Sequence, residues 1–206
     1  MIKKIVTTRF VDEESRQEYQ FEPVEDTISF SSIEKGGKGE RGYVLKYLTL
    51  DQNPMSPDEF GDDCLFLVHY HRQFCIPNKE ISEQQLAEIY HKKEEETNDY
   101  YVFPVSAYIH SGVILSLGNH FGIDPGGWDT SHVGAIFASK KEWDNREKAL
   151  SAAECLLKEW NHYLSGEVYC CVREKLDEEK VMDDYDIVGG FYGYEDAKEA
   201  LKNDDF

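Results

Sequence analysis

Short runs of apolar and β-branched residues recur along the chain and predict a protein rich in β-strands. Residues 100–109, YYVFPVSAYI, form the strongest run, and residues 27–33, TISFSSI, alternate apolar and polar side chains as a half-exposed strand does. Residues 176–186, LDEEKVMDDYD, break the pattern and predict a charged turn. Strands are therefore expected at residues 2–11, 27–33, 43–50, 64–71, 100–109, 113–117, 133–138, 167–173 and 187–194.

Three stretches carry helical signals. Ser82 followed by Gln85, and Ser139 followed by Glu142, are capping boxes, in which two side chains satisfy free N–H groups of a first helical turn. After Ser139, apolar residues recur at helical spacing and indicate that one side of the helix lies on the core. We therefore expect helices from Ser82, from Ser139 to about Leu164, and from Tyr194.

The order of these elements predicts the fold class. Strands and helices do not alternate regularly, which argues against a parallel α/β arrangement. We expect an α+β protein: a single domain, residues 1–206, with a largely antiparallel twisted sheet and about three helices packed on it. Residues 1–50 are expected to form an N-terminal β-hairpin subregion. A chain of 206 residues is long enough to bury a sizeable core.

The charge balance narrows the function classes. The chain has 41 acidic and 22 basic residues, which give a formal net charge of −19. Such a field repels the phosphates of nucleic acid and the surfaces of anionic membranes, so we expect neither as a direct partner. It attracts basic proteins, of which nucleic-acid-binding proteins are the commonest in a cell. Alternatively, the charge serves only solubility.

Cysteine usage and hydropathy indicate a reduced, cytoplasmic environment. The five cysteines form no C-x-x-C pair, which argues against a disulfide framework and against a four-cysteine zinc site. No apolar run is long enough for a signal peptide or for a membrane span. We expect no cofactor and no bound metal.

One glycine-rich loop and its edges bring together more hydrogen-bonding and reactive side chains than any other stretch. Two apolar segments flank this loop, with His110 and Ser111 at one edge and Trp128 and Asp129 at the other. Asp129 and the threonine after it are expected to cap exposed backbone N–H groups. Trp128 has two interpretations: it closes the core at the base of the loop, or it is a hot spot for a binding partner.

An enzymatic interpretation stays open beside the binding one. His69 and His71 lie two apart on a predicted strand, so both imidazoles face the same side and could share a zinc ion with a third ligand. His110, Ser111 and Asp129 are the residue types of a hydrolase triad, but sequence neighbours on a strand point to opposite faces. No nucleophile elbow or P-loop motif is present. A hydrolytic or metal-dependent site would lie around His69, His71, His110 and Asp129.

An acidic segment forms a second candidate surface. Residues 51–63, DQNPMSPDEFGDD, hold two prolines, five acidic residues and no basic one. Prolines and Asx residues predict a surface loop with turns. Such a loop is either a solvated connection or a display of carboxylates. Its acidic residues are Asp51, Asp58, Glu59, Asp62 and Asp63.

Three stretches together resemble one protein family. They are DQNPMSP from Asp51, HSG from His110 with WDTSHVG from Trp128, and YLSGEVY from Tyr163. In that order they are similar to an uncharacterised family of hypothetical proteins encoded by bacteriophages and integrative mobile elements. The resemblance covers roughly residues 45–195 and assigns no catalytic residue. It implies an accessory gene of a phage or mobile element.

Origin and charge together lead to a functional hypothesis. A small, acidic accessory protein of this origin is expected to bind and inhibit a host nucleic-acid-binding defence enzyme, as an anti-CRISPR or anti-restriction protein, with carboxylates standing in for DNA phosphates. We expect a non-enzymatic binding protein in the host cytoplasm, whose partner is a basic host protein. The predicted binding residues are Asp51, Asp58, Glu59, Asp62, Asp63, His110, Ser111, Trp128 and Asp129.

Overall fold

A computed structural model of the chain confirms the α+β class. Its described residues form ten strands, four α-helices and one 3-10 helix at Glu25–Thr27 (η1). Every pairing between these strands is antiparallel, as expected. Two four-stranded sheets and one two-stranded sheet take the place of one continuous sheet. The structure describes residues 9–11, 18–34, 41–60, 63–70, 82–92, 97–118, 121, 124–179 and 182–203.

Contacts along the chain gather in two compact units. Unit 1 is Met1–Pro54 together with Gly166–Phe206, and unit 2 is Met55–Ser165. The chain therefore leaves unit 1 once, builds unit 2 and then returns to unit 1. That residues 1–206 behave as one domain stays a prediction.

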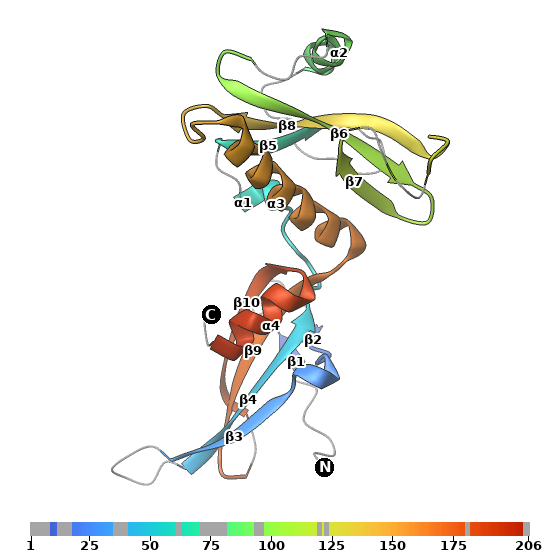
Figure 1. The fold of residues 1–206 in the computed structure, drawn as a ribbon. Coiled ribbons are helices and arrows are strands. Elements are labelled where there is room, and N and C mark those ends of the chain that lie inside the picture. Colours follow the sequence, from blue (N-terminus) through green and yellow to red (C-terminus); the bar gives the residue numbers. More distant parts are fainter. Residues whose placement is uncertain are drawn as a thin grey trace. The chain divides into compact units, whose positions relative to one another are not determined.

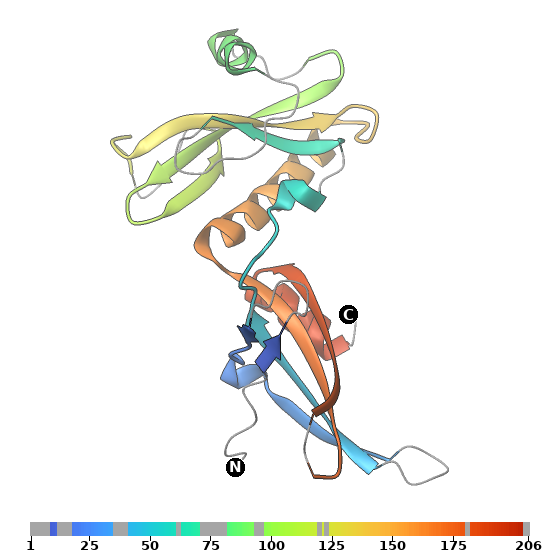
Figure 2. The ribbon, with the colours of Figure 1, turned by 180° about the vertical axis from the view of Figure 1, so that it is seen from behind.

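The main sheet of unit 1 joins the two ends of the sequence. The strands of this unit are β1 (Arg9–Val11), β2 (Glu18–Gln20), β3 (Ser29–Glu34), β4 (Arg41–Leu50), β9 (Val168–Leu176) and β10 (Met182–Tyr192). Four of them form one sheet in the order β10-β9-β4-β3, which is seen from behind in Figure 2. β3 and β4 form a hairpin within residues 1–50, and β4 pairs on its other side with β9.

The helix predicted from Tyr194 is confirmed as α4, Tyr194–Asn203, and it packs on one face of this sheet (Figure 1). Ala197 and Leu201 of the helix form one buried cluster with Leu48 of β4 and Cys171 of β9. The acidic residues of α4 are exposed. The helix is therefore amphipathic, with one side on the core and the other in water.

The opposite face of the sheet carries a second core of unit 1. Leu45, Tyr47, Val172 and Leu176 are buried there. Glu174 is also fully buried, and its carboxylate accepts a hydrogen bond of 2.6 Å from the Tyr47 hydroxyl. A charged group leaves water at lower cost where a hydrogen bond replaces its hydration. The Tyr47 hydroxyl therefore helps to stabilise Glu174 in this core.

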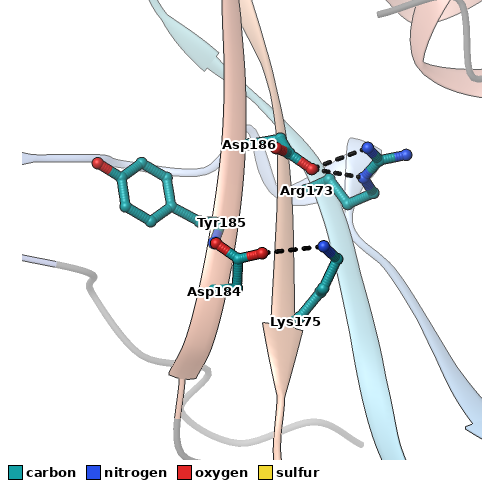
Figure 3. Close-up of polar contacts among 5 residues, drawn as sticks. All are labelled: Arg173, Lys175, Asp184, Tyr185 and Asp186. Atoms are coloured by element: carbon teal, nitrogen blue, oxygen red, sulfur yellow. Dashed lines mark hydrogen bonds and ion pairs between the residues drawn. The ribbon is translucent and has the colours of Figure 1, made fainter.

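Ion pairs explain why the last strand is longer than predicted (Figure 3). The prediction of a charged turn at residues 176–186 is wrong for the second half of this range, because β10 begins at Met182. Asp184 lies opposite Lys175, with an N···O distance of 2.9 Å, and Asp186 lies opposite Arg173 at 2.8 Å. Opposite charges that face each other across two strands stabilise their pairing. The acidic side chains thus extend the sheet instead of ending it.

Unit 2 is built on the second four-stranded sheet. Its elements are α1 (Pro57–Phe60), β5 (Leu65–His69), α2 (Glu83–Lys92), β6 (Tyr100–Ile109), β7 (Val113–Leu117), β8 (Thr130–Ser139) and α3 (Arg146–Ser165). The strand order is β5-β8-β6-β7. α3 crosses one face of the sheet and α2 lies on the other (Figures 1 and 2). The strand predicted at residues 100–109 is confirmed in full as β6.

Trp160 is the largest side chain in the larger core of unit 2. It extends from α3, is 0% exposed, and belongs to a cluster that includes Leu67 and Phe103 from the sheet. A smaller cluster occupies the other face, where α2 contributes one buried leucine. Its members are Phe66, Val68, Leu86, Val102, Ala135 and Phe137.

The capping box predicted at the start of α2 is confirmed. The backbone N–H of Ser82 donates to Gln85 Oε1 at 2.8 Å, and the backbone N–H of Gln85 donates to Ser82 Oγ at 3.3 Å. The two side chains thus satisfy each other's backbone donors, which fixes the first turn of the helix.

The second predicted capping box is wrong. Ser139 is the last residue of β8 and pairs with Tyr100, so it cannot open a helix. α3 begins at Arg146, and Asn145 caps it: Asn145 Oδ1 accepts a hydrogen bond of 3.0 Å from the backbone N–H of Lys148. An asparagine directly before a helix is a favoured N-cap. Ser139 cannot serve as this cap because it belongs to β8.

Candidate functional site

Four of the predicted binding residues meet at one end of the unit 2 sheet. The turn between β6 and β7 carries His110 and Ser111, and the loop that leads into β8 carries Trp128 and Asp129. A backbone hydrogen bond of 2.9 Å from the Ile109 N–H to the Asp129 carbonyl joins the turn to the loop. We call His110, Ser111, Trp128 and Asp129 the tip surface. All four residues are exposed.

One carboxylate holds the loop of the tip surface. Asp124 accepts hydrogen bonds from the backbone N–H of Trp128 at 3.1 Å, from the backbone N–H of Asp129 at 2.9 Å and from the Thr130 hydroxyl at 2.8 Å. The bond from Thr130 is the main cause that lowers the pKa of Asp124 below its usual 3.8. The expectation that Asp129 and Thr130 are the caps is therefore wrong. Asp124 is the acceptor, as an aspartate that opens a Pro-Gly-Gly turn can be.

Trp128 lies on the surface and does not close the core. Its side chain is 91% exposed, which excludes the first of its two interpretations. The indole lies over Gly126, where an added Cβ atom would be 2.5 Å from both Cδ1 and Nε1 of the ring. Only a glycine lets the ring approach the backbone this closely. The loop thus presents a large aromatic side chain to solvent.

The side chains around Trp128 keep much of their hydrogen-bonding capacity for a partner. Within the described part of the chain, the Asp129 carboxylate, the Ser111 hydroxyl and the Trp128 indole N–H make no hydrogen bond or ion pair. The His110 ring stacks on Tyr108, with ring centroids 6.3 Å apart and an angle of 15° between the planes. The backbone is held while the polar side-chain groups stay open, which is the arrangement of a preorganised binding surface.

The structure does not bring His69 to the residues of the proposed enzymatic site. His69 is 3% exposed, and its ring packs edge-on against the buried indole of Trp160 in α3. It pairs with Gly134, four residues along β8 from Thr130, where the tip surface begins. At about 3.3 Å per residue in a strand, the step from Gly134 to Thr130 alone spans roughly 13 Å. Asp129 lies one residue beyond Thr130, and His110 lies two residues beyond Tyr108, which pairs with Thr130. A single metal ion cannot be shared across that distance.

The remaining parts of the enzymatic hypothesis find no support among the described residues. His71 lies outside them, and within them no group of three histidine, cysteine or acidic side chains could hold a metal ion. The structure does place a serine beside a histidine: Ser106 Oγ lies 3.2 Å from His132 Nδ1. Ser106 is 0% exposed, however, so a substrate cannot reach its hydroxyl.

The acidic segment 51–63 divides between the two units. Asp51 belongs to unit 1, whereas Asp58, Glu59 and Asp63 belong to unit 2, and Asp62 lies outside the described residues. Glu59 and Asp63 are exposed, and Asp58 in α1 is half-buried. The segment is therefore a connection between units, and each part of it follows the geometry of its own unit.

Asp51 has a local structural role in unit 1. Its carboxylate accepts a hydrogen bond of 3.0 Å from the backbone N–H of Asn53, which fixes a turn. It also lies beside Cys170, where burial and then the charge of Asp51 raise the pKa of the Cys170 thiol to about 12. That thiol stays protonated at neutral pH and is not a nucleophile.

Comparison with known proteins finds no matching family model, no matching curated protein and no matching solved structure. Within the part of the chain that the structure describes, no helix has the length and apolar character needed to cross a bilayer.

The role of Asp124 leads to a prediction about loop order. We expect Asp124→Ala to lower the backbone order parameters of Trp128 and Asp129 from about 0.85 to below about 0.6, because three hydrogen bonds are lost. Because the folded loop lowers the pKa of Asp124 below 3.8, the ionised carboxylate stabilises the folded loop at neutral pH. This stabilisation is lost as the pH falls through the pKa of Asp124 in the folded protein. Nitrogen-15 relaxation at pH 7 and pH 3 measures both effects.

The matched control for this experiment is Asp144→Ala. Asp144 is an exposed aspartate of the same unit, and its partner is Lys148 at 3.0 Å. This variant makes the same change of charge, but it should leave the order of the loop at Trp128 unchanged. A rigid loop in Asp124→Ala at pH 7 would contradict the assigned role of Asp124.

Proposed function

We propose that this protein is a phage or mobile-element accessory factor that binds and inhibits a host nucleic-acid-binding defence enzyme, such as a CRISPR or restriction enzyme. It would act in the cytoplasm of the host cell as a binding protein and not as a catalyst. The observation that carries the proposal is the exposed Trp128, held in place by Asp124 on a strongly acidic protein. Exposed aromatic side chains of this kind dominate the energetics of protein interfaces.

The charge of the chain favours a basic partner. With a net charge of −19, the protein attracts surfaces that are rich in lysine and arginine, and these are the surfaces with which enzymes hold nucleic acid. Exposed carboxylates occur in both units. In unit 1 they include Glu178, Glu179, Glu195 and Glu199, and in unit 2 they include Asp99, Asp129, Glu142 and Glu147.

These features would make two contributions to binding of the enzyme. Carboxylates that occupy the nucleic-acid channel of the enzyme would compete with phosphates, and the tip surface would add an aromatic contact at one place. The first contribution weakens as salt rises, because ions screen exposed charges beyond about 8–10 Å. The second depends less on salt because it rests on the contact of an aromatic surface with its partner.

The test is capture of the target from host lysate. Tagged protein is incubated with lysate at low salt, the resin is washed at rising salt, and eluted proteins are identified by mass spectrometry. We expect a basic nuclease or CRISPR component that elutes with salt and whose nucleic-acid binding falls when the purified protein is added. If no nucleic-acid enzyme is captured at low salt, the proposed function is wrong.

A further inference from the structure

We propose that the tip surface binds an arginine side chain of its partner, with the guanidinium stacked on the Trp128 indole and paired with the Asp129 carboxylate. The inference rests on the proposed function only for the identity of the protein that carries the arginine. The chemistry of recognition comes from the tip surface itself.

Trp128 is presented for contact in a way that the other two tryptophans are not. Its exposure is 91%, whereas Trp143 is half-buried and Trp160 is 0% exposed. Its backbone N–H is bonded to Asp124, so the backbone from which the indole extends is held before any partner arrives, and the ring lies against Gly126. A preorganised aromatic group loses little conformational freedom on binding.

A cation is the favoured occupant of this surface. The face of an indole carries negative electrostatic potential and binds cations better than the rings of tyrosine or phenylalanine do. Asp129 follows Trp128 directly, is exposed, and has no side-chain partner within the described part of the chain. Two consecutive residues thus offer an exposed indole and a free carboxylate on a protein of charge −19. A basic group complements both.

Arginine fits this pair of groups better than lysine does. The guanidinium is planar, so it stacks on a ring, and its N–H groups point outward in its plane, where they reach a carboxylate at the same time. An ammonium group is compact and strongly hydrated, and it cannot lie flat on the ring. The chemistry of an indole with a carboxylate therefore favours arginine over lysine, although the two side chains have equal charge.

An apolar or anionic partner fits less well. An apolar pocket that closed over Trp128 would remove water from the Asp129 carboxylate without replacing its hydrogen bonds, which is costly. His110 and Ser111 make the rest of the tip surface polar, so a dry apolar contact would bury their groups as well. A nucleic-acid phosphate would meet the charge of Asp129 and be repelled.

The experiment titrates the nitrogen-15-labelled protein with two short synthetic peptides. Both contain glycine and serine with three basic residues, which are arginines in one peptide and lysines in the other. We expect the arginine peptide to shift the signals of the Trp128 indole N–H and the Asp129 amide, and to bind roughly two- to fivefold more tightly than the lysine peptide. Trp128→Leu and Asp129→Asn should each weaken arginine-peptide binding by a similar factor.

The controls separate this contact from general attraction by charge. Asp144→Asn removes one exposed negative charge from the same unit and should leave the affinity within error. Equal affinity for the two peptides, or equal losses in Asp129→Asn and Asp144→Asn, would overturn the proposal, and so would a Trp128 indole signal that does not move. Circular dichroism verifies that each variant is folded.

The outcomes also distinguish this inference from the proposed function. If the peptides bind at Trp128 as expected but no nucleic-acid enzyme is captured from lysate, the arginine site stands and the proposed function is wrong. If the enzyme is captured equally well by the wild type and by Trp128→Leu, and the arginine peptide does not shift the indole signal, the proposed function stands and the arginine site is wrong.

Discussion

Trp160→Ala is expected to lower the free energy of unfolding of unit 2 by about 3–5 kcal/mol. The indole is 0% exposed and lies in the core between α3 and the sheet, where it contacts His69 and Tyr163 edge-on, with centroid distances of 6.5 and 5.5 Å. Truncation leaves a cavity that the packed strands cannot fill without moving. Urea unfolding followed by far-ultraviolet circular dichroism measures the loss.

The control is the same substitution at the tip surface. Trp128→Ala removes an indole that is 91% exposed, so its effect on unfolding should stay within about 0.5 kcal/mol. Similar losses for Trp160→Ala and Trp128→Ala would mean that the core assignment of Trp160 is wrong. The pair also separates stability from binding, because only Trp128 is expected to matter for a partner.

Gly134→Ala is the second change with a large expected effect, about 3 kcal/mol or more. Gly134 lies on β8 opposite His69, and an added Cβ atom would be 2.1 Å from the carbonyl oxygen of Val68. That oxygen belongs to the backbone of β5, so the clash can be relieved only by separating the two strands. We expect a lower urea midpoint and loss of amide protection along β5.

Gly112→Ala provides the comparison for this prediction. Gly112 lies in the turn between β6 and β7, and an added Cβ atom there meets nothing within 4 Å. The same added methyl group should therefore change stability by no more than about 0.5 kcal/mol. An equally mild result at Gly134 would contradict the close approach of β5 and β8.

Local patterns in the sequence predicted those elements whose signals lie within one segment. The capping box at Ser82 and the strand at residues 100–109 are examples, since neighbouring residues decide both. The predicted start of α3 was wrong because Ser139 pairs in the sheet with Tyr100, some forty residues away in the sequence. The acidic start of β10 was missed for the same reason: Arg173, on another strand, neutralises Asp186.

The site was predictable in part. One glycine-rich loop with His110 and Trp128 at its edges indicated a surface, and a backbone hydrogen bond in the structure does join these two edges. Sequence could not show that Trp128 points to solvent, because a tryptophan beside glycines is equally consistent with a core position. Nor could it show the three hydrogen bonds by which Asp124 holds this loop, because they form only in the folded loop.

The place of unit 2 within the chain has a consequence for folding during synthesis. β4 ends at Leu50, but β9, its partner in the sheet, is complete only at Leu176. At 5–20 residues per second, a ribosome needs roughly 6–25 s to make the segment between them. The last strand of unit 2 ends at Ser139, so all its strands are made before β9 is complete, and unit 2 can fold first. During this time the apolar residues of β4 are not yet covered by β9. These residues of β4 reach their full packing only after β9 has been made.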